Sequence, residues 1–196
     1  MPGFGQKPAK LFGNLGWKMY ANILTIAGSD SGGGAGIQAD LKAISATGAY
    51  GLSVITALTA QNTVGVDAIY PVAIDFLKQQ MRTVARDIRF DAVKVGMLGT
   101  LEMIEAAAEF LETQSCPVVV DPVMVAKSGD RLLQADAISA LRDVLIPQAS
   151  VITPNLPEAA DLLDVMEASD RDTMLAPARA LLALGPQAGI VERWPS

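Results

Sequence analysis

The 196-residue sequence contains no histidine and a single cysteine, and both shortages limit its chemistry. Without histidine, the chain alone cannot form a Ser-His-Asp or Cys-His catalytic unit or a histidine-based zinc site. A single cysteine also excludes a disulfide within the chain. Cys116 comes just before the apolar run 117–120, which predicts a small buried hydrophobic side chain rather than a nucleophile. A general base must therefore be a carboxylate or come from elsewhere.

Basic residues and long apolar runs are also scarce. Lys and Arg number 15 against 21 Asp and Glu, a net charge of −6, and no basic cluster could neutralise a nucleic-acid backbone. No apolar run approaches the ~20 residues of a membrane span. We therefore expect a cytoplasmic protein that binds neither nucleic acid nor membrane. A homodimer is compatible with the sequence, which does not specify the oligomeric state.

The composition predicts one globular unit after a short extension. Glycine and proline interrupt residues 1–18, which show neither helical nor strand periodicity, so we expect a flexible N-terminal extension over residues 1–20. Hydrophobic residues make up 51% of the chain and the mean hydropathy is +0.33, values that suit a sheet buried on both faces. We expect a single domain over residues 21–196.

A glycine-dense turn follows the first apolar strand of this domain. Gly32, Gly33, Gly34 and Gly36 fall within five positions and allow the backbone to approach a ligand closely. The next helix begins here, and either Ser31 or Asp30 is expected to cap it. Unpaired N–H groups at a helix start attract anions and polar ligands. The density of glycine predicts a ligand site more than a merely tight turn.

Two familiar phosphate motifs do not fit this turn. The Walker pattern ends in Gly-Lys-Ser/Thr, whereas this chain has Gly33-Gly34-Ala35 and so lacks the phosphate-binding lysine. Gly34, Gly36 and Ala39 match a dinucleotide fingerprint, but Gln61 stands where an acidic residue should end the second strand. The sequence therefore predicts a glycine turn that faces a polar amide, and not a dinucleotide fold.

Apolar strands and amphipathic helices alternate along the chain. We expect strands at 23–28, 52–58, 92–95, 118–120 and 150–153, and helices at 37–48, 74–84, 103–111, 132–145, 159–163 and 173–184. This order predicts an α/β fold with a mostly parallel sheet and helices on both faces. Ligands of such sheets bind beyond the carboxyl ends of the strands. The residues expected there are Gly28, Gln61, Met97, Asp121 and Asn155.

Five motifs, in order, closely resemble the hydroxymethylpyrimidine/phosphomethylpyrimidine kinases of thiamine biosynthesis, which belong to the ribokinase-like superfamily. They occupy residues 26–40, 56–63, 94–98, 121–129 and 153–159. Pyridoxal kinases share the fold and the Asp-Pro-Val and Asn-x-x-Glu elements. The runs Gly-Gly-Gly-Ala-Gly-Ile-Gln-Ala-Asp and Ala-Gln-Asn-Thr favour the pyrimidine kinases.

The resemblance implies an ATP-dependent kinase with two sets of site residues. It implies that the pyrimidine is bound by Gly28, Asp40, Gln61, Met97 and Met124. It also implies that Asp121, Lys127, Asn155 and Glu158 bind the nucleotide, and that Asp121 and Glu158 hold Mg²⁺. A carboxamide such as that of Gln61 suits an aminopyrimidine edge, because it offers both a donor and an acceptor.

The sequence departs from the family pattern near its end. The family continues to a Gly-Thr-Gly-Cys turn that forms the anion hole and supplies the catalytic cysteine, and this segment is absent from the 196 residues. We therefore assign no catalytic residue and expect a C-terminally truncated kinase domain that is inactive as it stands. Two alternatives stay open: a non-catalytic pyrimidine-binding remnant, and a pyridoxal kinase-like enzyme.

Overall fold

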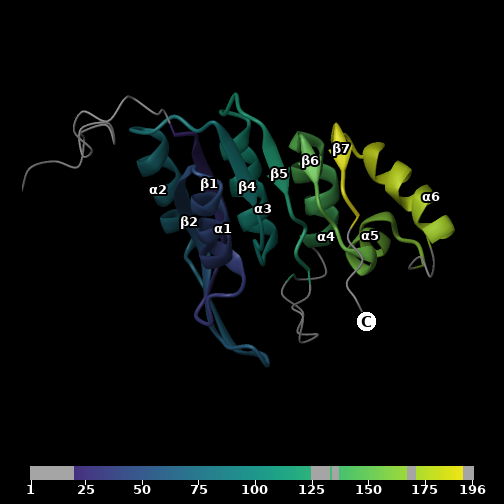
Figure 1. Ribbon diagram of the computed structural model, residues 1–196, viewed down its shortest axis with the longest axis horizontal. Coiled ribbons are helices and arrows are strands. Elements are labelled where there is room, and N and C mark those ends of the chain that lie inside the picture. The colour runs from purple at the N-terminus through teal and green to yellow at the C-terminus, as the bar shows by residue number, and fades with distance from the viewer. Residues whose placement is uncertain (1–19, 125–132, 134–136, 167–170, 192–196) are drawn as a thin grey trace, which may run out of the picture.

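The computed structural model describes residues 20–124, 133, 137–166 and 171–191. Within these residues it forms an α/β fold (Figure 1). The elements, in chain order, are β1 (Asn22–Asp30), α1 (Gly36–Ala46), β2 (Tyr50–Gln61), β3 (Val66–Pro71), α2 (Ile74–Ala85), β4 (Ala92–Val95), α3 (Leu101–Leu111), β5 (Val118–Val120), α4 (Ala137–Ala140), η2 (Leu141–Leu145), η3 (Ile146–Gln148), β6 (Val151–Ile152), α5 (Leu156–Leu163), α6 (Arg171–Leu182) and β7 (Ala188–Gly189).

One sheet of seven strands organises the described residues, in the order β3-β2-β1-β4-β5-β6-β7. Every pair of neighbouring strands is parallel except β2 and β3, which are antiparallel. The predicted α/β class with a mostly parallel sheet is therefore confirmed. Because β1, β4, β5 and β6 run the same way, their carboxyl ends meet at one edge of the sheet, and the loops that follow them lie side by side.

The first face of the sheet carries the main hydrophobic core. Strand register places Leu24 beside Leu52 and Val93, and all three side chains are buried. Helices α2, α3 and α4 pack together on this side (Figure 1). Leu77 of α2 and Ile104 of α3 are fully buried in the same cluster. Burial of each such side chain stabilises the fold by about 1.5–3 kcal/mol, which explains the regular alternation of apolar residues in these strands.

The second face is covered by α1 over β1 and β2. Thr25 of β1 and Lys94 of β4 are register partners and project from this face. Thr25 is fully buried, whereas Val119 of β5 and Val151 of β6 are only half-buried. Helices thus lie on both faces, as predicted. The polar residues of the second face lie beneath the carboxyl edge of the sheet, where the predicted site residues are found.

Some elements differ from the predictions. The antiparallel strand β3 and the short strand β7 were not expected, and β2 is longer than predicted. Of the predicted helix 132–145, the structure describes Leu133, which lies in a bend, and residues 137–145. The helix changes from α-helical to π-helical geometry at Leu141 and to a 3₁₀ turn at Ile146. Pro147 explains the last change, since proline cannot donate the hydrogen bond that continues a helix. In the described part of the chain, no helix is both long and apolar enough to cross a bilayer.

Candidate active site

The glycine turn after β1 is held together by the carboxylate of Asp30, which is buried. Its Oδ1 accepts from the amide N–H of Gly32 at 2.7 Å, and its Oδ2 accepts from those of Gly34 and Ala35, both at 2.8 Å. The turn then enters α1 at Gly36, whose φ is +53°. A Cβ at Gly36 would lie 2.2 Å from the carbonyl oxygen of Gly28, so this position requires glycine.

This geometry corrects two expectations for the turn. The amide groups of Gly32, Gly34 and Ala35, which precede the first helical residue, are not open to a ligand, because the Asp30 carboxylate already accepts from them. The N-cap of α1 is Ala35, which makes no side-chain cap bond, so neither Ser31 nor Asp30 stands at the expected cap position. The Ser31 hydroxyl is used elsewhere, as described next. Asp30 satisfies the amides just before the helix from outside the usual cap position. The turn therefore has a fixed shape without a ligand, because the negative charge that its amides bind belongs to Asp30 of the same segment.

Ser31 fastens the glycine turn to the end of β2. Its Oγ donates to the carbonyl oxygen of Gln61 and accepts from the Gln61 backbone N–H, both at 2.8 Å. The Gln61 carboxamide is half-exposed, and its Oε1 lies 3.1 Å from the Thr59 hydroxyl. That hydroxyl also lies 2.9 Å from the carbonyl oxygen of Ser29 and has only one proton to donate. Gln61 can therefore turn to a ligand without leaving Thr59 unpaired.

Gly28 and Met97 lie in contact at the ends of β1 and β4. A Cβ at Gly28 would lie 2.6 Å from Met97 Cε, so the absence of a side chain at Gly28 leaves the space that the Met97 thioether occupies. Met97 is buried, and its carbonyl oxygen accepts from the Thr56 hydroxyl at 2.7 Å. Two residues assigned to the pyrimidine from the sequence are therefore neighbours, and β2 fixes the position of one of them.

A chain of polar contacts runs across the second face of the sheet below this edge. The Thr25 hydroxyl donates to Asp40 Oδ2 at 2.6 Å. Lys94 Nζ then lies 2.9 Å from Asp40 Oδ1 and 3.3 Å from Asp121 Oδ2. The exposed fractions of these charged side chains are 26% for Lys94, 15% for Asp40 and 31% for Asp121, so solvent screens the two ion pairs only in part. Lys94 thus joins a predicted pyrimidine residue to a predicted metal ligand.

The charge state of Lys94 follows from opposing effects. Burial lowers the pKa of its ammonium group, but the carboxylates of Asp121 and Asp40 outweigh this and hold the pKa above its usual value. Lys94 is therefore a fixed positive charge throughout the neutral range.

Asn155 and Glu158 form a capping box at the start of α5. The Asn155 side chain accepts from the backbone N–H of Glu158, and Glu158 Oε2 accepts from the backbone N–H of Asn155, both at 2.9 Å. Pro157 within the first turn and the extended backbone of Asn155 fit this helix start. Glu158 is only 6% exposed. Both residues therefore stabilise the start of α5, in addition to the role in nucleotide binding that the sequence predicts for them.

Two further predicted residues are not brought into this arrangement. Met124 is 2% exposed and packs in the hydrophobic core of the first face. Lys127 lies outside the described residues. Their roles toward substrate and nucleotide stay predictions.

Sequence reasoning gave no role to Thr25 or Lys94, and it considered Asp30 only as one of two candidate caps of the helix, not as the acceptor that holds the whole turn. Lys94 was detectable as the one charged residue within the short strand Ala92–Val95. A lysine among buried positions needs a carboxylate partner, and two carboxylates were already among the candidates.

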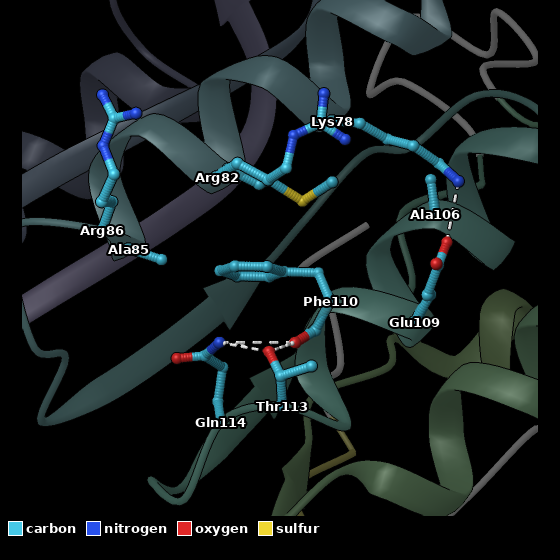
Figure 2. A pocket seen from close by; sticks show the side chains of 10 residues that line it. Lys78, Arg82, Ala85, Arg86, Ala106, Glu109, Phe110, Thr113 and Gln114 are labelled. Carbon is cyan, nitrogen blue, oxygen red and sulfur yellow. Dashed lines mark hydrogen bonds and ion pairs between the residues drawn. The ribbon is translucent and has the colours of Figure 1, made fainter.

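The structure also has a groove away from this site, between α2 and α3 (Figure 2). Its volume is about 380 Å³, and Met81, Ala85 and Phe110 supply apolar surface. Lys78 and Glu109 form an ion pair of 2.7 Å beside it (Figure 2). None of the predicted site residues lines this groove, so it is not the predicted pyrimidine pocket.

Comparison with known proteins identifies close relatives. The chain is 55% identical over 172 residues to the hydroxymethylpyrimidine/phosphomethylpyrimidine kinase of Salmonella typhimurium, a match that covers 87% of this chain and 65% of the relative. It is 56% identical over 165 residues to the enzyme of that name from Escherichia coli, with 84% and 62% covered. The chain thus spans somewhat less than two thirds of the length of these curated relatives.

Solved structures agree in fold. The crystal structure of phosphomethylpyrimidine kinase from Clostridium difficile has a TM-score of 0.81 and 46% identity, covering 88% of this chain and 74% of that one. Pyridoxal kinase from Staphylococcus aureus in complex with ADP has a TM-score of 0.80 and 38% identity, covering 89% and 63%. These matches confirm the ribokinase-like fold. The family model for phosphomethylpyrimidine kinase matches residues 30–192, and the chain belongs to this family.

Proposed function

We propose that this chain carries the pyrimidine pocket and part of the phosphoryl-transfer site of an ATP-dependent kinase. The substrates would be 4-amino-5-hydroxymethyl-2-methylpyrimidine and its monophosphate, in thiamine biosynthesis. The observation that carries the proposal is the Lys94 bridge, which joins Asp40 and Asp121 below the carboxyl edge of the sheet. Family membership supports the reaction class.

Gln61 and the Gly28–Met97 pair would form the pyrimidine side. The carboxamide of Gln61 would face the ring nitrogen and amino group, while the apolar thioether of Met97 would contact the ring. Gly28 leaves room for that thioether. The glycine turn closes the same side, and Asp30 and Ser31 hold its shape. Such a prefolded wall lowers the entropic cost of binding.

Asp121, Asn155, Glu158 and Lys127 would form the nucleotide side. Asp121 and Glu158 supply carboxylate oxygens, which Mg²⁺ prefers. Among the described residues no group of three or more His, Cys, Asp or Glu side chains is arranged around a metal position. Mg²⁺ is usually held by one or two carboxylates together with phosphates and water, and Asp121 and Glu158 would be these carboxylates. When bound, the ion neutralises charge on the phosphates of the nucleotide.

Nucleotide use is supported by solved relatives. The Staphylococcus aureus pyridoxal kinase was solved with ADP and with AMP-PCP. The cytoplasmic location and the homodimer stay predictions, and the expected partners remain a small pyrimidine and ATP.

Replacement of Gln61 by leucine tests the pyrimidine pocket directly. We expect Gln61→Leu to weaken binding of the hydroxymethylpyrimidine by about 1–3 kcal/mol, because a polar ligand edge loses its partner in a desolvated site. Isothermal titration of both proteins measures this, and Gln79→Leu on the exposed part of α2 is the matched control. Unchanged affinity in Gln61→Leu would remove this residue from the site.

Two further readouts separate the alternatives. Pyridoxal competes weakly with the pyrimidine if the proposal holds, and stronger competition by pyridoxal would favour a pyridoxal kinase-like enzyme. ATP-dependent formation of the pyrimidine phosphate, followed by mass spectrometry, distinguishes a kinase from a binding module. Binding is the decisive measurement for the pocket, because Gln61→Leu changes a residue that would contact the pyrimidine.

A further inference from the structure

Lys94 occupies a position from which it contacts the two halves of the proposed site at once. It lies in β4, between β1 on one side and β5 on the other. Its Nζ contacts Asp40 of α1 at 2.9 Å and Asp121, which follows β5, at 3.3 Å. The ion pairs Lys78–Glu109, Arg89–Asp91 and Arg142–Asp143 each join one cation to one carboxylate, whereas Lys94 contacts two.

The surroundings restrict where the ammonium group can go. A Cβ at Gly96, the residue after β4, would lie 3.4 Å from Lys94 Nζ and 3.1 Å from Ala27 Cβ, so the Gly96 backbone lies close to the ammonium group. Asp40 is also held on its other oxygen by the Thr25 hydroxyl, which is fully buried. The lysine therefore has a short range of movement between two carboxylates.

We infer that Lys94 is a positioning residue that couples the pyrimidine side of the site, through Asp40, to the nucleotide side, through Asp121. The inference rests on the proposed function. One ammonium group shared by two carboxylates binds each less strongly than it would bind one alone. Loss of negative charge at Asp121 shifts the ammonium toward Asp40 and fixes the Asp40 carboxylate more firmly.

A double-mutant cycle with the pyrimidine as ligand measures this coupling. We expect Asp121→Asn to tighten pyrimidine binding about three- to tenfold, in the lower part of the range for residues that share a partner, because a better fixed Asp40 loses less freedom on binding. In the Lys94→Met background, Asp121→Asn leaves the affinity unchanged. An equal effect of Asp121→Asn in both backgrounds, or no effect in either, would overturn the inference.

Lys78→Met is the matched control for loss of a lysine. Lys78 forms a comparable ion pair with Glu109, but beside the α2–α3 groove (Figure 2). In the Lys78→Met background, Asp121→Asn should tighten pyrimidine binding as it does in the unmodified chain. The absence of that effect in this control would show that loss of any lysine abolishes it, and would also overturn the inference.

A second cycle needs no ligand and keeps Lys94 intact. Asp40→Asn, Asp121→Asn and the double variant are unfolded in urea. Because both carboxylates share one ammonium, the shift of the midpoint in the double variant should differ from the sum of the single shifts, whereas additive shifts would overturn the coupling. Should the unmodified chain bind no pyrimidine, the proposed function fails, and this cycle still tests whether Asp40 and Asp121 are coupled through their shared ammonium group.

Discussion

At the scale of single residues, the glycines of the turn after β1 are not equivalent. Gly36 has a positive φ, and a Cβ there would overlap the carbonyl oxygen of Gly28. Gly48 also has a positive φ, +79°, but a Cβ there would meet nothing within 4 Å. An alanine substitution at each position therefore distinguishes the free-energy cost of the backbone conformation, which both share, from that of the steric overlap, which only Gly36 has.

We therefore expect Gly36→Ala to destabilise the fold more than Gly48→Ala. The left-handed backbone costs an alanine about 1–3 kcal/mol at either position. Only Gly36→Ala adds displacement of the β1 backbone. Urea unfolding of the two variants measures the difference. Equal losses of stability would show that the β1 backbone moves away from the added methyl group without a loss of free energy.

Asp30 is the residue on which the shape of the turn depends most. We expect Asp30→Ala to lower the free energy of unfolding by about 1–3 kcal/mol, because three backbone amide groups lose their hydrogen bonds to a charged carboxylate. Asp67→Ala, at an exposed position of β3, is the control for removal of a carboxylate and should change stability little. If Asp30→Ala changed the free energy of unfolding as little as Asp67→Ala, water would be an equally good acceptor for the amides of the turn.

Residue identity alone predicted which side chains gather at the candidate site, but not the contacts among them. Gly28, Asp40 and Asp121 were identified from motifs that follow strands or open helices. The contact of Lys94 with two of these carboxylates depends on strand order and on the register of Thr25 with Lys94, which local patterns do not contain. The role of Asp30 depends on the path of a turn whose glycines allow many conformations.

At the scale of elements, α5 shows a helix start that serves the predicted site. The Asn155–Glu158 capping box satisfies two backbone N–H groups that would otherwise be unpaired. We expect Asn155→Ala to destabilise the protein by about 0.5–2 kcal/mol, measured by urea unfolding without nucleotide. Glu158→Gln is the control, because an amide oxygen can still accept from the Asn155 N–H. An equally large loss in Glu158→Gln would show that the charge itself stabilises the helix start.

Periodicity missed the strand β3 and the π-helical segment for two different physical reasons. All residues of β3 after its first are exposed, so the strand has no apolar alternation to detect. The α-to-π change at Leu141 keeps apolar residues buried at Leu141 and Leu145, and a helical pattern does not distinguish the two geometries. Elements with one clearly buried face, such as α2 and β4, matched their predicted ranges within one or two residues.

At the scale of the whole molecule, alkaline pH should weaken the fold in two stages. Burial raises the pKa of the Cys116 thiol above its usual value of 9.0, and the carboxylates of Asp121 and Asp40 raise that of Lys94 despite its burial. A group whose pKa is raised by folding stabilises the protein fully below its unfolded pKa and loses that contribution as the pH passes the folded value. Stability should therefore be level from pH 7 to about 8.5 and fall above pH 9.

Urea midpoints measured between pH 7 and 11 check this expectation. Cys116→Ala should remove the part of the decline that begins near pH 9 and leave the part above pH 10, which belongs to Lys94. A decline of the same size and onset in Cys116→Ala would exclude the thiol as its source.

The strand order has a consequence for how the chain folds as it is synthesised. Strand β2 joins β1, β3 joins the outer edge of β2, and β4 then joins the opposite edge of β1. Strands β5, β6 and β7 follow outward, each beside the one before it. Within the described residues, no strand has to enter between two strands that are already paired. A nascent chain leaving the ribosome can thus extend the sheet one strand at a time, and no earlier pairing has to open for a later one to form.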